Sequence, residues 1–166
     1  MNPSHSHKPH NLPGEHAITD IGQLILFAIF VLLMVFDIFI FQFSNKTLGT
    51  LSQMVTIPLF LIFFLIGGYF ILTSHRIIFR ETDKEVSVVT KGVFNIVRHP
   101  MYFGSIFLFF SFVILSNSVL AFLIWIVICF FYYFIARYEE KLLVNKYGDK
   151  YEEYQKKVPM FVPFSK

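Results

Sequence analysis

The sequence predicts an all-α integral membrane protein with about four membrane-crossing helices, the last two forming a tight hairpin, and a C-terminal amphipathic helix on the membrane surface. Two observations support this fold class. Hydrophobic residues make up 55% of the 166 residues and charged residues only 15%. The charged residues fall between apolar runs that are long enough to cross a bilayer as helices. We therefore expect a multi-pass membrane protein and exclude a nucleic-acid-binding domain.

The domain organisation is predicted to be simple. Residues 1–20 form a polar, histidine-rich tail, and residues 21–166 form a single membrane domain. The tail contains a His-x-His pair, for which we expect adventitious metal affinity only. The single cysteine, Cys129, lies inside an apolar run, so no disulfide and no metal site are predicted.

The first two crossings are expected at 21–43 and 54–72. Asp37 lies inside the first of them, and a carboxylate within a membrane is costly unless it is paired. We favour a hydrogen bond from a neighbouring helix or a snorkelling side chain over a role in proton or substrate transfer. The pair Gly67-Gly68 in the second crossing would let another helix approach closely.

The hairpin is expected to consist of helices at 101–115 and 119–136, joined by a tight turn. The first arm would be only about 22 Å long, which is short for a full crossing. From Arg137 the chain becomes polar, and its apolar residues follow helical spacing as far as Val158, with an interruption at Gly148. This pattern predicts an amphipathic helix on the membrane surface.

The distribution of basic residues predicts the orientation. Of the 14 Lys and Arg residues, five lie in the connector 75–98 and seven lie in the C-terminal segment that starts at 137. Two crossings separate these segments, so the positive-inside rule places both on the cytoplasmic side. With four crossings, the N-terminus and the C-terminus are both predicted to be cytoplasmic.

A polar motif opens the hairpin at Arg98-His99-Pro100-x-Tyr102. Proline suits the first turn of a helix, where its missing N–H would have no partner. Free amides and the helix dipole favour anionic groups at the same place. A helix start alone would need the proline but no cation, imidazole or phenol beside it, so the motif indicates a binding site.

A second polar motif, Glu139-Glu140, appears where the last crossing leaves the membrane. Neighbouring carboxylates point about 100° apart on a helix, so we expect only one to face a given site. A carboxylate can bind an amino group or ribose hydroxyls, while an imidazole and free amides can bind a carboxylate. These are the polar groups of S-adenosylmethionine.

The two motifs resemble those of a family of integral membrane methyltransferases that includes isoprenylcysteine carboxyl methyltransferase and the phospholipid methyltransferases. The resemblance covers roughly residues 76–164. Its first part is Thr90-x-Gly92-Val93-Phe94-x-x-x-Arg98-His99-Pro100-x-Tyr102-x-Gly104, and its second is Glu139-Glu140-x-x-Leu143, with Tyr147-Gly148-x-x-Tyr151-x-x-Tyr154 and Val158-Pro159 after it.

The resemblance implies methyl transfer from S-adenosylmethionine, held at the cytoplasmic face, to a lipophilic prenylcysteine-, lipid- or thiol-type acceptor that comes from the bilayer. It carries no prediction of the oligomeric state. The residues implied to bind the cofactor are Val86, Ser87, Val88, Val89, Phe94, His99, Pro100, Met101, Tyr102 and Glu139.

Two departures from the family pattern bear on the site. Phe94 stands where the family usually has tyrosine, which removes one hydroxyl contact. Ile135 stands where the isoprenylcysteine enzymes have an arginine for the substrate carboxylate, and the nearest arginine is Arg137. Arg137 is therefore the candidate substrate-binding residue for an acceptor that carries a carboxylate. The apolar Ile135 favours instead a neutral or amine-bearing acceptor.

Methyl transfer needs little acid–base assistance, and Arg98 and Glu140 are the candidates for any such catalytic role.

Two other functional classes remain open. Sterol and steroid reductases share a similar Arg-His-Pro-x-Tyr segment and a Tyr-Gly-x-x-Tyr tail but use a nicotinamide cofactor such as NADPH. The Glu139-Glu140 pair and the short chain argue against them. A non-enzymatic membrane scaffold would explain the apolar runs but not the pairing of the two motifs.

Overall fold

The computed structural model of the chain describes residues 13–41, 52–81 and 88–161, and over these residues it contains helices and no strand. Most of the polar tail lies outside the described residues. The elements are α1 (Pro13–Phe36), a π-helix η1 (Asp37–Phe41), α3 (Gln53–Glu81), a 3₁₀-helix η2 (Gly92–Asn95), α4 (Pro100–Ser116), α5 (Val119–Tyr147) and α6 (Asp149–Lys157).

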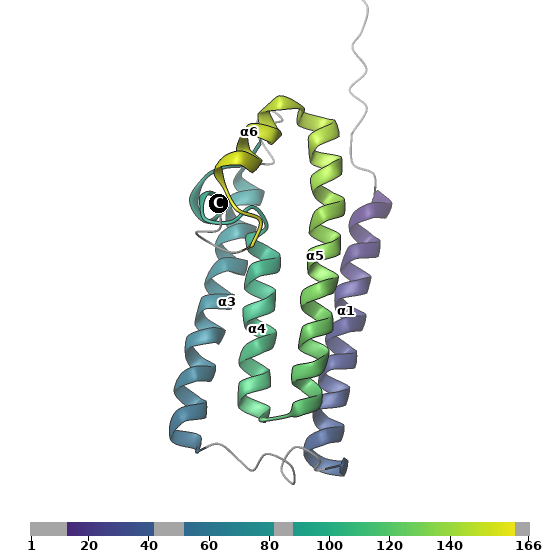
Figure 1. Cartoon of the computed structure of the whole chain (residues 1–166), viewed down its shortest axis with the longest axis vertical. Helices are drawn as coiled ribbons and strands as arrows, with labels where there is room; N and C mark the ends of the chain where they lie inside the picture. Colours follow the sequence, from purple (N-terminus) through teal and green to yellow (C-terminus); the bar gives the residue numbers. More distant parts are fainter. Residues whose placement is uncertain (1–12, 42–51, 82–87, 162–166) are drawn as a thin grey trace, which may run out of the picture.

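The four long helices stand side by side (Figure 1). Helix α3 packs most extensively on α4, α4 forms a hairpin with α5, and α1 packs on α5. The short helix α6 folds back from the end of α5 towards the end of the bundle where α4 begins (Figure 1). The N-terminus of α4, which carries the Arg98-His99 motif, therefore lies beneath the C-terminal segment.

Three helical stretches are long and apolar enough to cross a membrane: Gly22–Ile40, Gln53–Arg80 and Val119–Tyr147. Many apolar side chains on them face outward; Leu65 is 67% exposed and Phe134 is 66% exposed. Such a surface suits lipid and would be unfavourable in water. Helix α4 is apolar but has only 17 residues, so the expected short arm of the hairpin is confirmed.

Several helices run further than their apolar segments. Helix α1 already begins at Pro13, inside the predicted polar tail, and α3 continues to Glu81. Helix α5 continues to Tyr147, so the first part of the predicted surface helix is a straight extension of the last long helix. The break comes at Gly148, whose φ of 57° suits a residue without a Cβ atom. Only the part beyond Gly148 separates as α6.

Close contact between α3 and α4 fixes the start of the hairpin. A Cβ atom on Gly67 would lie 2.7 Å from the carbonyl oxygen of Gly104, and one on Gly104 would lie 2.7 Å from the carbonyl oxygen of Gly67. The close approach expected at Gly67 is thus confirmed, with a glycine of the polar motif as its partner. At Gly68 a Cβ atom would meet no described atom within 4 Å.

The main apolar core lies between α1, α4 and α5. At the end of the bundle away from α6, Asp37 is buried and accepts a hydrogen bond from the hydroxyl group of Ser118. The Ser118 oxygen also accepts a hydrogen bond of 3.1 Å from the N–H of Ala121, which caps α5. The expected hydrogen bond to Asp37 from a neighbouring helix is therefore confirmed.

Candidate functional site

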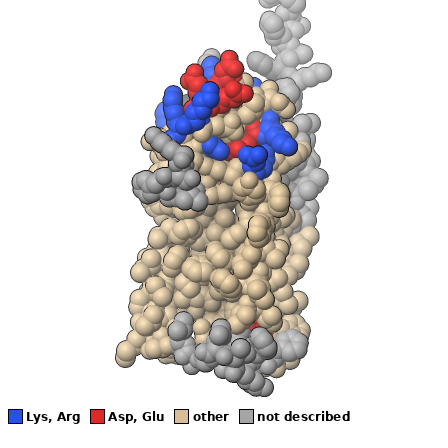
Figure 2. All heavy atoms as spheres, viewed as in Figure 1, with Lys and Arg blue, Asp and Glu red and all other residues tan. Residues whose placement is uncertain are grey.

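Charged side chains gather at one end of the molecule. On the face that Figure 2 shows, Lys, Arg, Asp and Glu lie over α6 and the last turns of α5, and the long middle part of the bundle is uncharged. The two sequence motifs meet at this end, because the hairpin brings the start of α4 beside the end of α5. We call the side chains of Arg98, His99, Tyr102, Glu139 and Glu140 the polar cluster.

Arg98 and Glu140 form a buried ion pair at the base of the cluster. Arg98 Nε lies 2.6 Å from Glu140 Oε1, and the two side chains are 11% and 6% exposed. Arg98 Nη1 also donates hydrogen bonds to the carbonyl oxygens of Gln155 (2.8 Å) and Val158 (2.6 Å). The amide of Gln155 donates to Glu140 Oε2 at 3.2 Å. The guanidinium group thus joins the start of α4, the end of α5 and the end of α6.

The backbone strengthens this connection. The N–H of Arg98 donates to the carbonyl oxygen of Pro159 at 2.9 Å, and the N–H of His99 donates to that of Met160 at 3.4 Å. These are donors that the start of α4 would otherwise leave without partners. The stretch that follows α6 therefore lies directly against the motif and closes the site on that side.

The segment before the motif contacts α6. The hydroxyl group of Tyr154 donates to the carbonyl oxygen of Phe94 at 2.5 Å, and Val88 packs against Tyr151, Tyr154 and Val158. Burial raises the pKa of both tyrosines well above the ordinary range, so both stay neutral. Of the other residues implied to bind cofactor in this segment, Val89 is half-buried, while Val86 and Ser87 lie outside the described residues.

His99 lies between the two carboxylates. Its Nδ1 is 3.6 Å from Glu139 Oε2, its Nε2 is 3.5 Å from Glu140 Oε1, and the residue is 7% exposed. Burial by itself would lower the pKa of His99, but the two carboxylates outweigh it and raise this pKa above its usual value. The Nε2 atom is buried and has no hydrogen-bond partner among the described residues. The raised pKa favours the protonated imidazole, whose Nε2 faces Glu140 across 3.5 Å without a hydrogen bond of good geometry.

Tyr102 connects the cluster to the apolar core. Its hydroxyl group donates to Glu139 Oε1 at 2.5 Å, and its ring stacks on those of His99 and Tyr132, with centroid distances of 5.7 Å and 5.1 Å. The side chain of Glu139 is 36% exposed, against 6% for that of Glu140. We expected only one carboxylate to face the site. The imidazole instead lies between them, so that both reach it from opposite ring nitrogens.

The remaining predicted residues lie at the edge of the cluster or away from it. Pro100 is buried in the first turn of α4, as expected, and Met101 beside it is exposed. Arg137 is exposed and lines a cleft of about 240 Å³ that also includes Glu140 and Lys141. Ile135 packs against the apolar core, so the position that would carry the family's arginine offers no cation.

Two contributors were not predicted from the sequence. Tyr132, whose ring supports Tyr102, lies two helical turns before Glu139 and therefore on the same face of α5. That spacing was visible but did not stand out in an apolar run rich in aromatic residues. Gln155 has no local signal, because its role depends on α6 folding back over the motif.

Helices of this length and apolarity, with a polar cluster at one end of the bundle, define a helical protein of the integral membrane class. The sequence profile described as "Phospholipid methyltransferase" matches residues 27–150, and the chain belongs to this family. The match covers both motifs and all five members of the polar cluster.

Named relatives are methyltransferases. The chain is 37% identical over 91 residues to the protein-S-isoprenylcysteine O-methyltransferase of Schizosaccharomyces pombe, covering 54% of this chain and 38% of that protein. It is 37% identical over 94 residues to protein-S-isoprenylcysteine O-methyltransferase B of Arabidopsis thaliana (55% and 46%). It is 31% identical over 105 residues to the methanethiol S-methyltransferase of Crocosphaera subtropica (61% and 40%). The matches span less than half of each of these relatives. No solved structure matches the chain.

Proposed function

We propose that the chain catalyses methyl transfer from S-adenosylmethionine to a lipophilic acceptor at the cytoplasmic face of a membrane. The observation that carries this proposal is the convergence of the two motifs. Glu139 and Glu140, about 40 residues after His99, both reach its imidazole, and Tyr102 donates to Glu139. The names of the relatives support the same chemistry, since they describe transfer to a prenylcysteine or to methanethiol.

The polar cluster fits the polar end of the cofactor. His99, whose protonated form the two carboxylates favour, suits a ligand carboxylate, and the partly exposed Glu139 suits an ammonium group or ribose hydroxyls. Tyr102 holds Glu139 in place. When bound, S-adenosylmethionine would supply an electrophilic methyl group. The acceptor's heteroatom would bond to the methyl carbon as the methyl–sulfur bond breaks, with S-adenosylhomocysteine as the leaving group, and the acceptor's proton would pass to solvent water.

Other residues would line the rest of the cofactor. We assign this role to Pro100 and Met101 at the start of α4 and to Val88, Val89 and Phe94 before it. Val88 packs against Tyr151 and Tyr154, and the carbonyl oxygen of Phe94 accepts a hydrogen bond from Tyr154. Val89 follows Val88 in the same segment, so the three residues and the neutral tyrosines would form an apolar wall. The same role is proposed for Val86 and Ser87 from the sequence alone.

We propose that Arg98 and Glu140 position the site and do not contact the reacting atoms. Each satisfies the other, and the remaining bonds of both go to the segment around α6. Proximity and exclusion of water then supply most of the acceleration of methyl transfer, which needs no general base on this chain.

The acceptor is proposed to be neutral or amine-bearing. Ile135 offers no cation, and the exposed Arg137 lines a cleft that shares Glu140, already paired with Arg98, with the polar cluster. The test compares the methylation of a lipophilic thiol, a lipophilic amine and a farnesylcysteine analogue by purified protein with S-adenosylmethionine. We expect the thiol or the amine to react fastest. Efficient ester formation on the farnesylcysteine analogue that is lost in Arg137→Ala but kept in Lys141→Ala would contradict this proposal.

The proposed orientation places α6 and the polar cluster in the cytoplasm, because the basic residues gather at that end of the molecule (Figure 2). Cysteines introduced at Lys46 and Asn117 should react with an impermeant reagent from outside intact cells. Cysteines at Lys84 and Lys156 should react only after the cells are opened. The opposite labelling pattern would reverse the orientation.

A further inference from the structure

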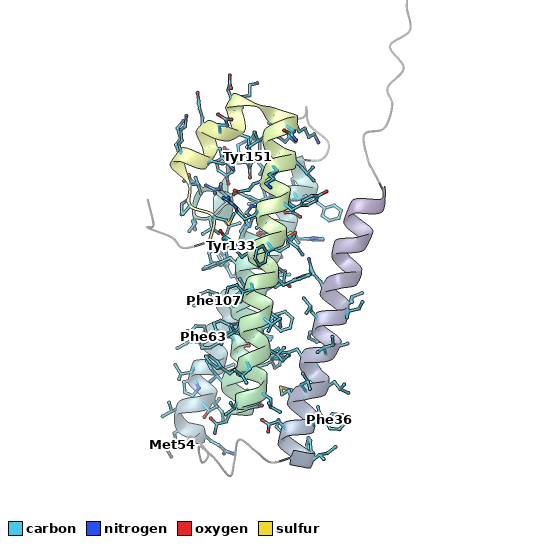
Figure 3. The ribbon with its side chains drawn as sticks, turned by 45° about the vertical axis from the view of Figure 1, so that its right-hand side comes forward. Phe36, Met54, Phe63, Phe107, Tyr133 and Tyr151 are labelled. Carbon is cyan, nitrogen blue, oxygen red and sulfur yellow. The ribbon has the colours of Figure 1, made fainter. Side chains whose placement is uncertain are left out.

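A second recess lies on the apolar side of the polar cluster. It is a cleft of about 400 Å³ between α1, α4 and α5, within the range of roughly 300–1,000 Å³ that is usual for small-molecule sites. The upper part of α1 diverges from α5 at this end of the bundle (Figures 1 and 3). The cleft is lined by Gln23, Leu24, Phe27, Ser105, Phe109 and Tyr132.

The lining has the chemistry of a site for an uncharged lipophile. Half of the described lining residues are apolar, the others are Gln23, Ser105 and Tyr132, and none is charged. A few uncharged polar groups in an apolar wall orient a ligand without requiring a counter-ion. The charged side chains Arg137 and Lys141 line the separate cleft on the end of α5. An acceptor that carried a carboxylate would therefore have no cation in the apolar cleft.

The cleft lies next to the polar cluster. Tyr132 lines the cleft and is 2% exposed, and its ring stacks on Tyr102. Tyr102 in turn donates its hydroxyl hydrogen bond to Glu139. Ser105 lies three residues after Tyr102 and so on the same face of α4. One aromatic ring therefore separates the cleft from the residues assigned to the cofactor.

The rim of the cleft faces outward. Leu24 is 68% exposed and Phe27 is 48% exposed, and both belong to a stretch of α1 that is apolar enough to lie in a membrane. Phe27 also packs against Phe109, with ring centroids 6.0 Å apart, at the inner wall. A ligand dissolved in the hydrocarbon of a bilayer can reach this rim without passing through water.

We propose that this cleft binds the methyl acceptor, an uncharged lipophile with a single aliphatic chain. The chain would lie between Leu24, Phe27 and Phe109, and the heteroatom would point towards Ser105 and Tyr132. The inference rests on the proposed function, because it assigns the acceptor of that reaction to a place and a chemical class.

The first test narrows the cleft with Leu24→Trp and uses Ile25→Trp as the matched control. Ile25 is the next residue of α1, is 54% exposed and does not line the cleft. We expect Leu24→Trp to raise KM for decanethiol about tenfold more than KM for ethanethiol, because the longer chain needs the space that the indole fills. The affinity for S-adenosylhomocysteine should stay the same, and Ile25→Trp should resemble the unmodified protein. Equal effects of the two variants would overturn the proposal.

The second test needs no methyl transfer. A decyl diazirine probe is photolysed with the cofactor-free protein in nanodiscs, and the labelled residues are identified by mass spectrometry. The proposal is supported if labelling at Gln23, Phe27 or Ser105 is saturable, is prevented by excess decanethiol and is lost in Leu24→Trp. This result would support the site even if no activity with S-adenosylmethionine is found. Labelling spread evenly over the lipid-facing residues of α1 and α3, without competition, would mean that the cleft holds only bilayer lipid and would overturn the proposal.

Discussion

The two ends of the helical bundle each bury a carboxylate, but they satisfy it differently. Asp37 accepts a hydrogen bond from a hydroxyl group, that of Ser118, which also caps α5. Glu140 pairs with a guanidinium group, contacts an imidazole and accepts a hydrogen bond from Gln155. The first arrangement joins η1, which continues α1, to the turn of the hairpin. The second joins three segments and leaves a buried imidazole nitrogen without a hydrogen-bond partner among the described residues.

We infer from this difference that the end with Asp37 is structural and that the polar cluster binds a ligand. A buried polar group costs stability unless it is paired, so an unsatisfied donor has to be offset elsewhere in the fold. The end with Asp37 has the arrangement of a helix cap. In the polar cluster, Glu139, Glu140 and Tyr102 contact the imidazole of His99, and Arg98 pairs with Glu140. We infer that this arrangement is a ligand site. Substitutions at Asp37 should therefore change stability without changing ligand affinity, whereas substitutions in the polar cluster should also change ligand affinity.

The largest loss of stability is expected from Arg98→Ala. The change removes the guanidinium partner of the buried Glu140 and two hydrogen bonds to the segment around α6, so unfolding should become easier by about 3–5 kcal/mol. Thermal unfolding in detergent measures this. The matched control is Lys157→Ala, which removes an exposed ion pair with Glu153 and should have little effect. Similar stabilities for the two variants would show that Arg98 does not hold the C-terminal segment.

A smaller loss is expected at the other end. Asp37→Ala removes the acceptor of the Ser118 hydroxyl group and should cost about 1–3 kcal/mol, whereas Asp37→Asn keeps an acceptor oxygen and should cost less. Neither change should alter the affinity for S-adenosylhomocysteine, because Asp37 lies at the opposite end of the bundle. A loss of affinity in folded Asp37→Asn would show that the two ends are coupled and that Asp37 is not purely structural.

The smallest effect concerns pH. The pKa of His99 is raised in the folded protein, so the folded state binds the proton more tightly than the unfolded chain does. Its stabilising contribution is complete below the unfolded pKa of about 6.5 and is lost as pH rises through the higher folded pKa. Unfolding measured from about pH 6 to about pH 9 should show this decline, and His99→Gln should lack it. A His99-dependent gain in stability over the same range would contradict the assignment of a charged imidazole.

Much of the fold could be predicted from the sequence because membrane helices depend on local properties. Apolar run length sets the helices, and Pro100 sets the start of α4. The ends of the helices were predicted less well. Polar residues beyond the apolar run of α5 continue its helix, since backbone hydrogen bonding does not stop at the membrane surface, and only the positive φ of Gly148 breaks it.

Within the candidate site, only the residues of the two sequence motifs could be predicted. Glu139 and His99 could be paired from the hairpin, because its tight turn brings the start of one helix beside the end of the next. The contacts of Arg98 with the carbonyl groups of Gln155 and Val158 could not be predicted from the sequence. Every residue has a backbone carbonyl oxygen, so the pattern of side chains does not indicate which one accepts a hydrogen bond. For the same reason, the sequence indicated a catalytic role for Arg98 where its contacts favour a positioning role.

Isothermal calorimetry with S-adenosylhomocysteine and with NADPH tests most directly whether the polar cluster binds S-adenosylmethionine. The unmodified protein should bind S-adenosylhomocysteine and not NADPH. His99→Ala and Glu139→Ala should each weaken that binding by about tenfold or more, because each leaves a polar ligand group without its partner. Glu152→Ala, an exposed carboxylate on α6, should bind normally. Binding of NADPH instead, or unchanged affinity for S-adenosylhomocysteine in both folded cluster variants, would show that the polar cluster is not a site for S-adenosylmethionine.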